Sequence, residues 1–169
     1  QIQAQPANEV PRLQLAHLLR RTGQPEASLP HYAEIVKADA RVSEARFGYA
    51  AALIRLRRYR EARDYLTDAM RVYPNDVAFA NALARVLAAS PDDSVRDGRR
   101  AASLMQPVVA HIRTTDLLET MAMAQAELGQ FTEATTWQKE AIATAGKSGA
   151  TDIAQRIADN LRTYEARKP

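Results

Sequence analysis

The residue types that most often carry catalysis or bind metals are sparse in this chain. His17, His31 and His111 lie far apart in different predicted helices, and the chain has no HExxH motif and no histidine tract. The chain has no cysteine, which excludes thiolate chemistry and disulfide bonds. We therefore predict no catalytic residue, no metal site and no cofactor, and we do not expect an enzyme.

Two short segments resemble ligand-binding loops in composition alone. Residues 90–93 (SPDD) offer oxygen ligands, but they lack the alternating ligands and the glycine of a calcium loop. Residues 146–149 (GKSG) lack the first glycine of a phosphate-binding loop at the required spacing. We interpret the second segment as a hinge between two helices.

Charge gives a weak indication of partners. The 23 basic and 20 acidic side chains leave a net charge of +3, and they mostly alternate along the chain. A basic cluster around one predicted turn is the best candidate for an acidic protein or a nucleic acid, although we favour a solvated turn as its explanation. It consists of Arg55, Arg57, Arg58, Arg60 and Arg63. We do not expect nucleic acid as a partner.

Membrane and targeting signals are not visible in this segment. No apolar run approaches the roughly 18 residues of a membrane span, so we expect no membrane insertion by this segment. Residues 1–10 lack the charged and apolar stretches of a signal peptide. The lack of cysteine does not decide the compartment, and localisation stays open.

Small residues recur along the chain at nearly constant spacing. One series, each preceded by a bulky or long apolar residue, is spaced by 34, 34 and 38 residues, and a second series is spaced by 34, 39 and 33. Such self-similarity is the mark of a repeat protein, in which each unit packs on its neighbours. The series are Ala16, Ala50, Ala84 and Ala122, and Ser28, Ala62, Ala101 and Ala134.

Each period reads as two helices. In residues 43–76, apolar side chains from Ala62 to Tyr73 recur at offsets of 0, 3, 4, 7, 8 and 11, which is a helical stripe. Pro74 then ends the helix, because proline cannot continue the hydrogen-bond ladder. The pattern predicts an all-α chain of helical hairpins.

This pattern resembles the tetratricopeptide repeat, a 34-residue helix-turn-helix unit, over about Glu9 to Gly146. The family's small residue in the first helix falls on the first alanine series, and its closing proline on Pro74. Its turn glycine falls on Gly23 and Gly129, and its second-helix alanines on Ala62 with Ala69 and on Ala134 with Ala141. The resemblance implies a right-handed α-solenoid of helix-turn-helix repeats with a C-terminal capping helix.

The expected organisation follows from the register. Residues 1–8 are the end of a preceding repeat or a linker, because Pro6 falls on a closing-proline position, and we expect a longer parent protein. The repeats are 9–42, 43–76, 77–114 and 115–148, followed by a capping helix over 149–169. The third repeat contains an inserted loop, residues 90–98, which we interpret as a tolerated surface insertion rather than a binding loop. Asp97 can cap the helix that follows.

The resemblance implies a protein-protein interaction scaffold whose first helices line a concave groove for a peptide or partner protein. Phe47 is notable, because it is a large aromatic at a groove position, beside Gly48 and Ala51, where we expect the backbone to be approachable. Arg20, Arg55 and Arg85 would bind carboxylates or carbonyls, and an acidic end would comprise Asp116, Glu119 and Glu127. The candidate partner-binding residues are Leu13, His17, Arg20, Phe47, Ile54, Arg55, Asn81, Arg85, Glu119 and Met123.

Several alternatives stay open. The carboxylate clamp of family members that bind chaperone C-termini is absent, because its positions hold Leu13, His17, Gly48, Ala78 and Ala82. An upstream repeat or another part of the same protein could fill the groove, and the chain could form a homo-oligomer. The chain could also be an accessory or assembly domain at the C-terminal end of a larger enzyme or membrane protein. Partner identity is not readable from the sequence.

Overall fold

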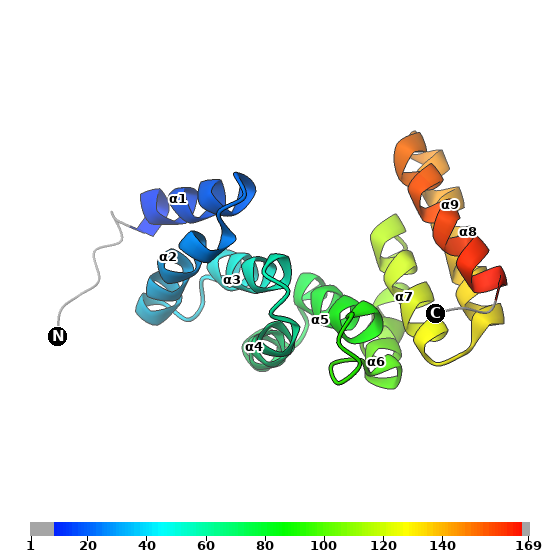
Figure 1. The fold of residues 1–169 in the computed structure, drawn as a ribbon, viewed down its shortest axis with the longest axis horizontal. Helices are drawn as coiled ribbons and strands as arrows, with labels where there is room; N and C mark the ends of the chain where they lie inside the picture. Colours follow the sequence, from blue (N-terminus) through cyan, green and yellow to red (C-terminus); the bar gives the residue numbers. More distant parts are fainter. Residues whose placement is uncertain (1–8, 167–169) are drawn as a thin grey trace. The chain divides into compact units, whose positions relative to one another are not determined.

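The computed structural model describes residues 9–166, and every regular element in that range is an α-helix (Figure 1). The interpretation of residues 1–8, including Pro6, falls outside the described residues. The helices are α1 (Glu9–Arg21), α2 (Pro25–Ala38), α3 (Ser43–Arg55), α4 (Tyr59–Val72), α5 (Val77–Ala89), α6 (Gly98–Val109), α7 (Thr115–Glu127), α8 (Phe131–Lys147) and α9 (Thr151–Glu165). The chain divides into two compact units, Gln1–Pro74 and Asn75–Pro169, which we describe in turn.

The first unit contains α1 to α4, and each helix packs against the next one along the chain. Its interior is built around the predicted small positions: Ala16, Ser28, Ala50 and Ala62 are all buried. Side chains of this size let helix backbones approach closely, so that larger neighbours fill the space between them. Two apolar clusters result, one of Ala16, Tyr32, Ile35 and Ala45, and one of Leu29, Ala52, Leu53 and Ala62.

The second unit contains α5 to α9. Here α7 packs against α5, α6 and α8, and α9 packs along α8. The small positions Ala84, Ala101, Ala122 and Ala134 are again buried. Two apolar clusters join α9 to its neighbours: Leu118, Ala141, Ala145 and Ile157 form one, and Ala122, Ala126, Ala134 and Tyr164 form the other.

The segment between α5 and α6 is held in place near its C-terminal end. The Asp97 side chain accepts a hydrogen bond from the Arg100 backbone N–H, so the predicted cap of α6 is confirmed. The Asp97 backbone N–H donates to the Leu87 carbonyl at 2.8 Å, and the Val95 side chain is buried. These contacts anchor the segment against the unit.

None of the helices that the structure describes is long and apolar enough to cross a membrane. The longest, α8, has 17 residues and carries charged side chains.

Candidate partner-binding faces

In the first unit, the predicted residues of α1 make contacts within the unit. Leu13 is partly buried and packs on the cluster that contains Ala16 and Tyr32. The His17 ring lies 5.6 Å from the Tyr32 ring, and its Nδ1 is 3.7 Å from a carboxylate oxygen of Glu44. The Arg20 Nε donates a hydrogen bond to the Tyr32 hydroxyl at 3.3 Å. Tyr32 of α2 thus contacts two of the predicted residues of α1, His17 and Arg20.

Gly48 differs from the sequence expectation of an approachable backbone. It is buried, and the Tyr32 ring from α2 covers the space where its side chain would stand. Burial raises the pKa of Tyr32, while the hydrogen bond from Arg20 opposes that shift, so the hydroxyl is neutral at physiological pH. The sequence gives no signal for this contact, because Tyr32 and Gly48 belong to different predicted repeats.

The predicted residues of α3 are more available to a partner. Phe47 is 40% exposed, and Arg55 is exposed at the end of the helix. Ile54 is half-buried and packs against the cluster that contains Leu53 and Ala62. The face formed by α1 and α3 therefore combines one accessible aromatic ring with cationic side chains on both helices.

The basic cluster around the turn between α3 and α4 is partly neutralised within the unit. Arg58 donates two hydrogen bonds to the Glu61 carboxylate, both at 2.6 Å, and also lies 3.5 Å from Glu26. These bonds hold the pKa of Glu61 below its usual range. Arg63 pairs with Asp64 at 2.8 Å. Because these carboxylates already neutralise part of the positive charge, the cluster attracts an acidic partner less strongly than its number of arginines suggests.

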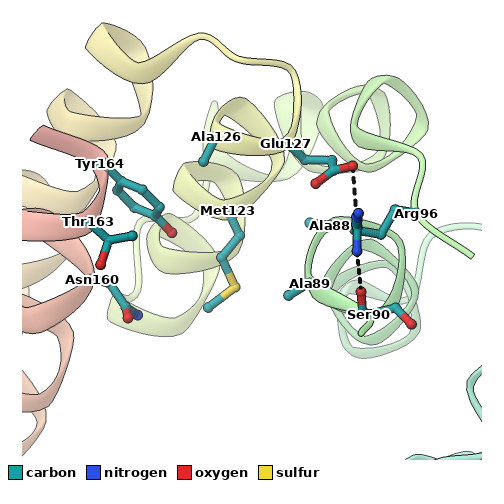
Figure 2. Close-up of a pocket in the computed structure, with 10 residues that line it drawn as sticks. All are labelled: Ala88, Ala89, Ser90, Arg96, Met123, Ala126, Glu127, Asn160, Thr163 and Tyr164. Atoms are coloured by element: carbon teal, nitrogen blue, oxygen red, sulfur yellow. Dashed lines mark hydrogen bonds and ion pairs between the residues drawn. The ribbon is translucent and has the colours of Figure 1, made fainter. Parts of the chain in front are cut away.

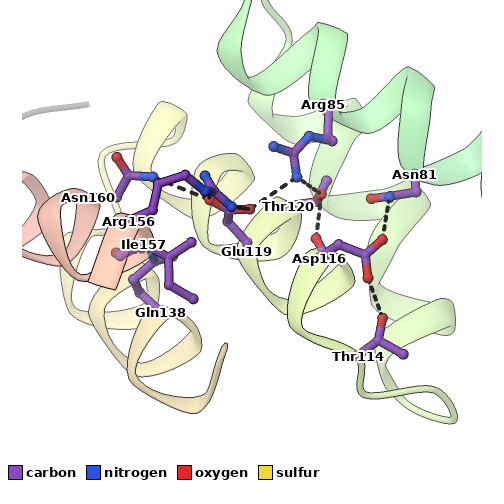
Figure 3. Close-up of polar contacts among 10 residues, drawn as sticks. All are labelled: Asn81, Arg85, Thr114, Asp116, Glu119, Thr120, Gln138, Arg156, Ile157 and Asn160. Atoms are coloured by element: carbon purple, nitrogen blue, oxygen red, sulfur yellow. Dashed lines mark hydrogen bonds and ion pairs between the residues drawn. The ribbon is translucent and has the colours of Figure 1, made fainter. Parts of the chain in front are cut away.

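Glu119 of the second unit is not the exposed acidic group expected from the sequence, and Figure 3 shows its polar contacts with Arg85, Arg156 and Asn160. Its side chain is 2% exposed and accepts hydrogen bonds from Arg85 of α5 at 3.4 Å and from Arg156 of α9 at 3.2 and 3.4 Å. Asn160 of α9 donates at 3.4 Å. Glu119 therefore links three helices, because a buried carboxylate requires charged or hydrogen-bonding partners.

The neighbouring predicted residues take part in the same polar network. The Arg85 guanidinium also donates to the Thr120 hydroxyl at 3.3 Å, and its side chain keeps 37% exposure. Asn81 donates to Asp116 at 3.2 Å. Arg156 and Asn160 were not predicted as site residues; the polar face of the capping helix was the available signal.

A cavity of about 350 Å³ lies beside this network (Figure 2). It is formed by the end of α5, the following loop, α7 and α9. Its lining includes Met123, a candidate partner-binding residue, and Glu127, which was expected at the acidic end of the groove. The other lining residues are Ala88, Ala89, Ser90, Arg96, Ala126, Asn160, Thr163 and Tyr164. The loop predicted as a tolerated insertion thus supplies two residues of the cavity lining, Ser90 and Arg96.

Potential metal ligands do not cluster in the part of the chain that the structure describes. Within residues 9–166, no group of three or more histidine, cysteine, aspartate or glutamate side chains could hold a metal ion. The described faces offer apolar, hydrogen-bonding and ionic contacts.

Helical hairpins packed in sequence order, with small residues at their contacts, define a helical-repeat scaffold. Residues 19–86 match the family model of the tetratricopeptide repeat. The predicted resemblance is confirmed over residues 19–86, and the described chain is an all-α helical-repeat solenoid. No curated protein matches the sequence significantly.

Solved structures show the same fold over most of the chain. MamA of Desulfovibrio magneticus RS-1, from residue 41 to its end, has a TM-score of 0.72 at 15% identity, covering 96% of this chain and 98% of that one. A MamA RS-1 ArsTM double mutant has a TM-score of 0.69 at 14% sequence identity, and the match covers 96% of this chain and 97% of that one. TTC0263, a thermophilic TPR protein of Thermus thermophilus, has a TM-score of 0.67 at 18% sequence identity, and the match covers 90% of this chain and 89% of that one. At these identities, the likeness establishes the fold.

Domains of this family bind protein partners, and the fold is generally a non-catalytic interaction scaffold. The match over residues 19–86 and the fold support a protein-interaction repeat scaffold.

Proposed function

We propose that the chain binds an acidic segment of a partner protein, with an apolar anchor residue, along the face that α1 and α3 present in the first unit. The observation that carries this proposal is the exposure of Phe47, which leaves 40% of a large aromatic residue accessible at a first-helix position. Aromatic residues of this kind contribute disproportionately to binding, since they bury a large area at small cost in conformational entropy.

The charge of the first unit supports an acidic partner. Residues 9–74 contain 12 lysines and arginines and 8 aspartates and glutamates, whereas the net positive charge of the whole chain is only +3. On the proposed face, the Arg20 Nε donates to the Tyr32 hydroxyl, and the rest of the guanidinium can bind a partner. Arg55 is exposed; it follows Ile54 directly and lies one helical turn after Ala51. Such cations orient a partner and accelerate its association.

We assign different roles to the predicted residues of the face. Phe47 and the accessible part of Ile54 supply apolar contact, and Arg20 and Arg55 bind carboxylates. Leu13 and His17 hold the face in shape through their contacts with Tyr32. A peptide recognised in this way obtains its affinity from one buried anchor and its orientation from the charges beside it.

In the second unit, the proposal places contact with a partner at Met123 and at the exposed part of Arg85. Glu119 and Asn81 are positioning residues, because their polar atoms bind other helices of the unit. A flexible methionine can adapt to different apolar side chains.

The test is a selection of binders from a random peptide library displayed on phage, with the whole chain as bait. The recovered peptides are expected to be acidic with a recurrent apolar residue. We expect Phe47→Ala to weaken the best peptide roughly 10- to 30-fold, and Arg55→Gln roughly 2- to 5-fold with a shallower dependence on salt.

Two variants on the second helix of the same hairpin serve as matched controls. The exposed fraction of Val72, 43%, is similar to that of Phe47, and Arg71 is an exposed arginine on the same helix as Val72. Val72→Ala and Arg71→Gln should change peptide affinity less than about 2-fold. Equal losses in Phe47→Ala and Val72→Ala, or a selection dominated by basic peptides, would reject the proposal. Circular dichroism confirms that each variant is folded.

A further inference from the structure

The cavity in the second unit has the size and lining of a specific binding site. Its volume of about 350 Å³ accommodates one or two amino-acid side chains, and its walls combine methyl groups with hydrogen-bonding groups. Met123, Ala88 and Ala126 supply the apolar part. Figure 2 shows the polar side chains of α9 along the opposite wall.

Tyr164 is the most informative of these side chains. It is 5% exposed, and its ring packs in the cluster of Ala122, Ala126 and Ala134. Its hydroxyl is directed toward the cavity, where a ligand or water can accept its hydrogen bond (Figure 2). A phenol hydroxyl on a cavity wall can donate a hydrogen bond to an acceptor of a ligand. Burial raises the pKa of Tyr164 to about 12, so the hydroxyl remains a donor at neutral pH.

The charged groups near the cavity are already paired. Arg96 donates to the Glu127 carboxylate at 3.0 Å and to the Ser90 carbonyl at 3.0 Å. Glu119, behind the α9 wall, is held by arginines. A charged ligand would lose its hydration without finding an unpaired counter-ion, whereas a neutral ligand avoids that cost.

The α9 wall also offers an acceptor. The Asn160 amide nitrogen donates to Glu119, which fixes the orientation of the group and leaves the Asn160 carbonyl oxygen as an acceptor. A donor on Tyr164 and an acceptor on Asn160, one helical turn apart, match the acceptor and donor of a carboxamide.

We propose that the cavity binds a glutamine or asparagine side chain of the partner segment. The ligand carbonyl would accept from the Tyr164 hydroxyl, the ligand NH2 would donate to Asn160, and its alkyl stem would lie against Met123 and Ala126. The proposal rests on the proposed function only in taking the ligand from a partner protein, because the cavity belongs to the other unit.

The test uses three small probes on the whole chain. Butyramide, butyrate and n-butylamine imitate neutral, anionic and cationic side chains of similar size. The methyl resonances of Met123 and Ala126 report binding by NMR. Butyramide should shift them saturably, with a dissociation constant on the order of 10 mM, and the two charged probes should bind at least about 3-fold more weakly.

Tyr164→Phe preserves the packed ring and removes only the hydroxyl, so the variant separates recognition from folding. It should weaken butyramide about 5-fold. Tyr59→Phe, in the first unit, is the matched control and should change nothing. Equal binding of the three probes, unchanged affinity in Tyr164→Phe, or no saturable shift up to about 200 mM would overturn the proposal. Because the probes do not involve Phe47, this outcome is independent of the peptide selection.

Discussion

The phenol ring of Tyr32 in α2 occupies the space that a side chain on Gly48 in α3 would need. A Cβ at Gly48 would lie 2.4 Å from Tyr32 Cε1 and 2.8 Å from its hydroxyl oxygen. The absence of a side chain at position 48 therefore lets the tyrosine reach the α1 side, where its hydroxyl accepts from Arg20. One glycine thus determines how the first unit builds its candidate binding face.

Gly48→Ala should destabilise the protein by about 1–3 kcal/mol, because the new methyl group displaces a fully buried ring. Gly146 is the matched control. It also lies within a helix, but nothing stands within 4 Å of its missing side chain. Gly146→Ala should stabilise by about 0.5–1 kcal/mol through helix propensity. Urea unfolding measures both, and the same sign of change in the two variants would contradict the packing role of Gly48.

Gly98 makes a close but less severe contact at the start of α6. A Cβ there would lie 3.0 Å from the Glu127 Cβ and Cγ and 3.1 Å from the Ala124 carbonyl oxygen. Because one of these neighbours is backbone, Gly98→Ala should separate α6 from α7 and cost about 1–2 kcal/mol. Thermal unfolding should show a lower midpoint. The Met123 methyl resonance should also move, since Glu127 lines the same cavity; an unchanged midpoint would show that the helices adjust without cost.

Glu119 should contribute more to the free energy of unfolding than an exposed glutamate that forms a single ion pair. Glu119→Gln keeps the shape but weakens the bonds from Arg85, Arg156 and Asn160, with an expected loss of about 1–2 kcal/mol. Hydrogen exchange should accelerate in α9, which loses its polar contact with α7. Glu165 pairs with Lys139 at 3.3 Å and is 50% exposed, so Glu165→Gln should cost less than about 0.5 kcal/mol. Equal losses would refute the assigned role of Glu119.

Tyr164 should make stability sensitive to alkaline pH. Its pKa rises to about 12 in the folded protein, chiefly through burial and further through Glu119, from an ordinary value of 10.0. The unfolded chain therefore loses this proton first, and the resulting stabilisation is complete below pH 10 and is lost between about pH 10 and 12. We expect a loss of about 1–2 kcal/mol from this residue.

The measurement compares urea unfolding of the parent protein and Tyr164→Phe from pH 9 to 12. The difference in stability between them should shrink as pH rises, because phenylalanine does not titrate. A constant difference would show that the Tyr164 proton is not coupled to folding. Tyr32 and Tyr65, whose pKa values burial also raises, are present in both proteins and cancel.

The helices and their contact positions were readable from the sequence. The eight small residues that define the two predicted series are all buried, and Asp97 caps α6 as expected. These features depend on local rules: the 3.6-residue period fixes which side chains share a face, and the cap depends on a backbone N–H three residues away.

The composition of the faces was decided by tertiary structure. Glu119 was expected to be exposed because its position in the repeat faces the groove, yet Arg156 and Asn160, 37 and 41 residues later, bury it. Gly48 is covered by Tyr32 from another hairpin, and the cavity requires Tyr164 opposite Met123. A helical period determines which way a residue points, but the length and chemistry of side chains on distant helices determine what it meets there.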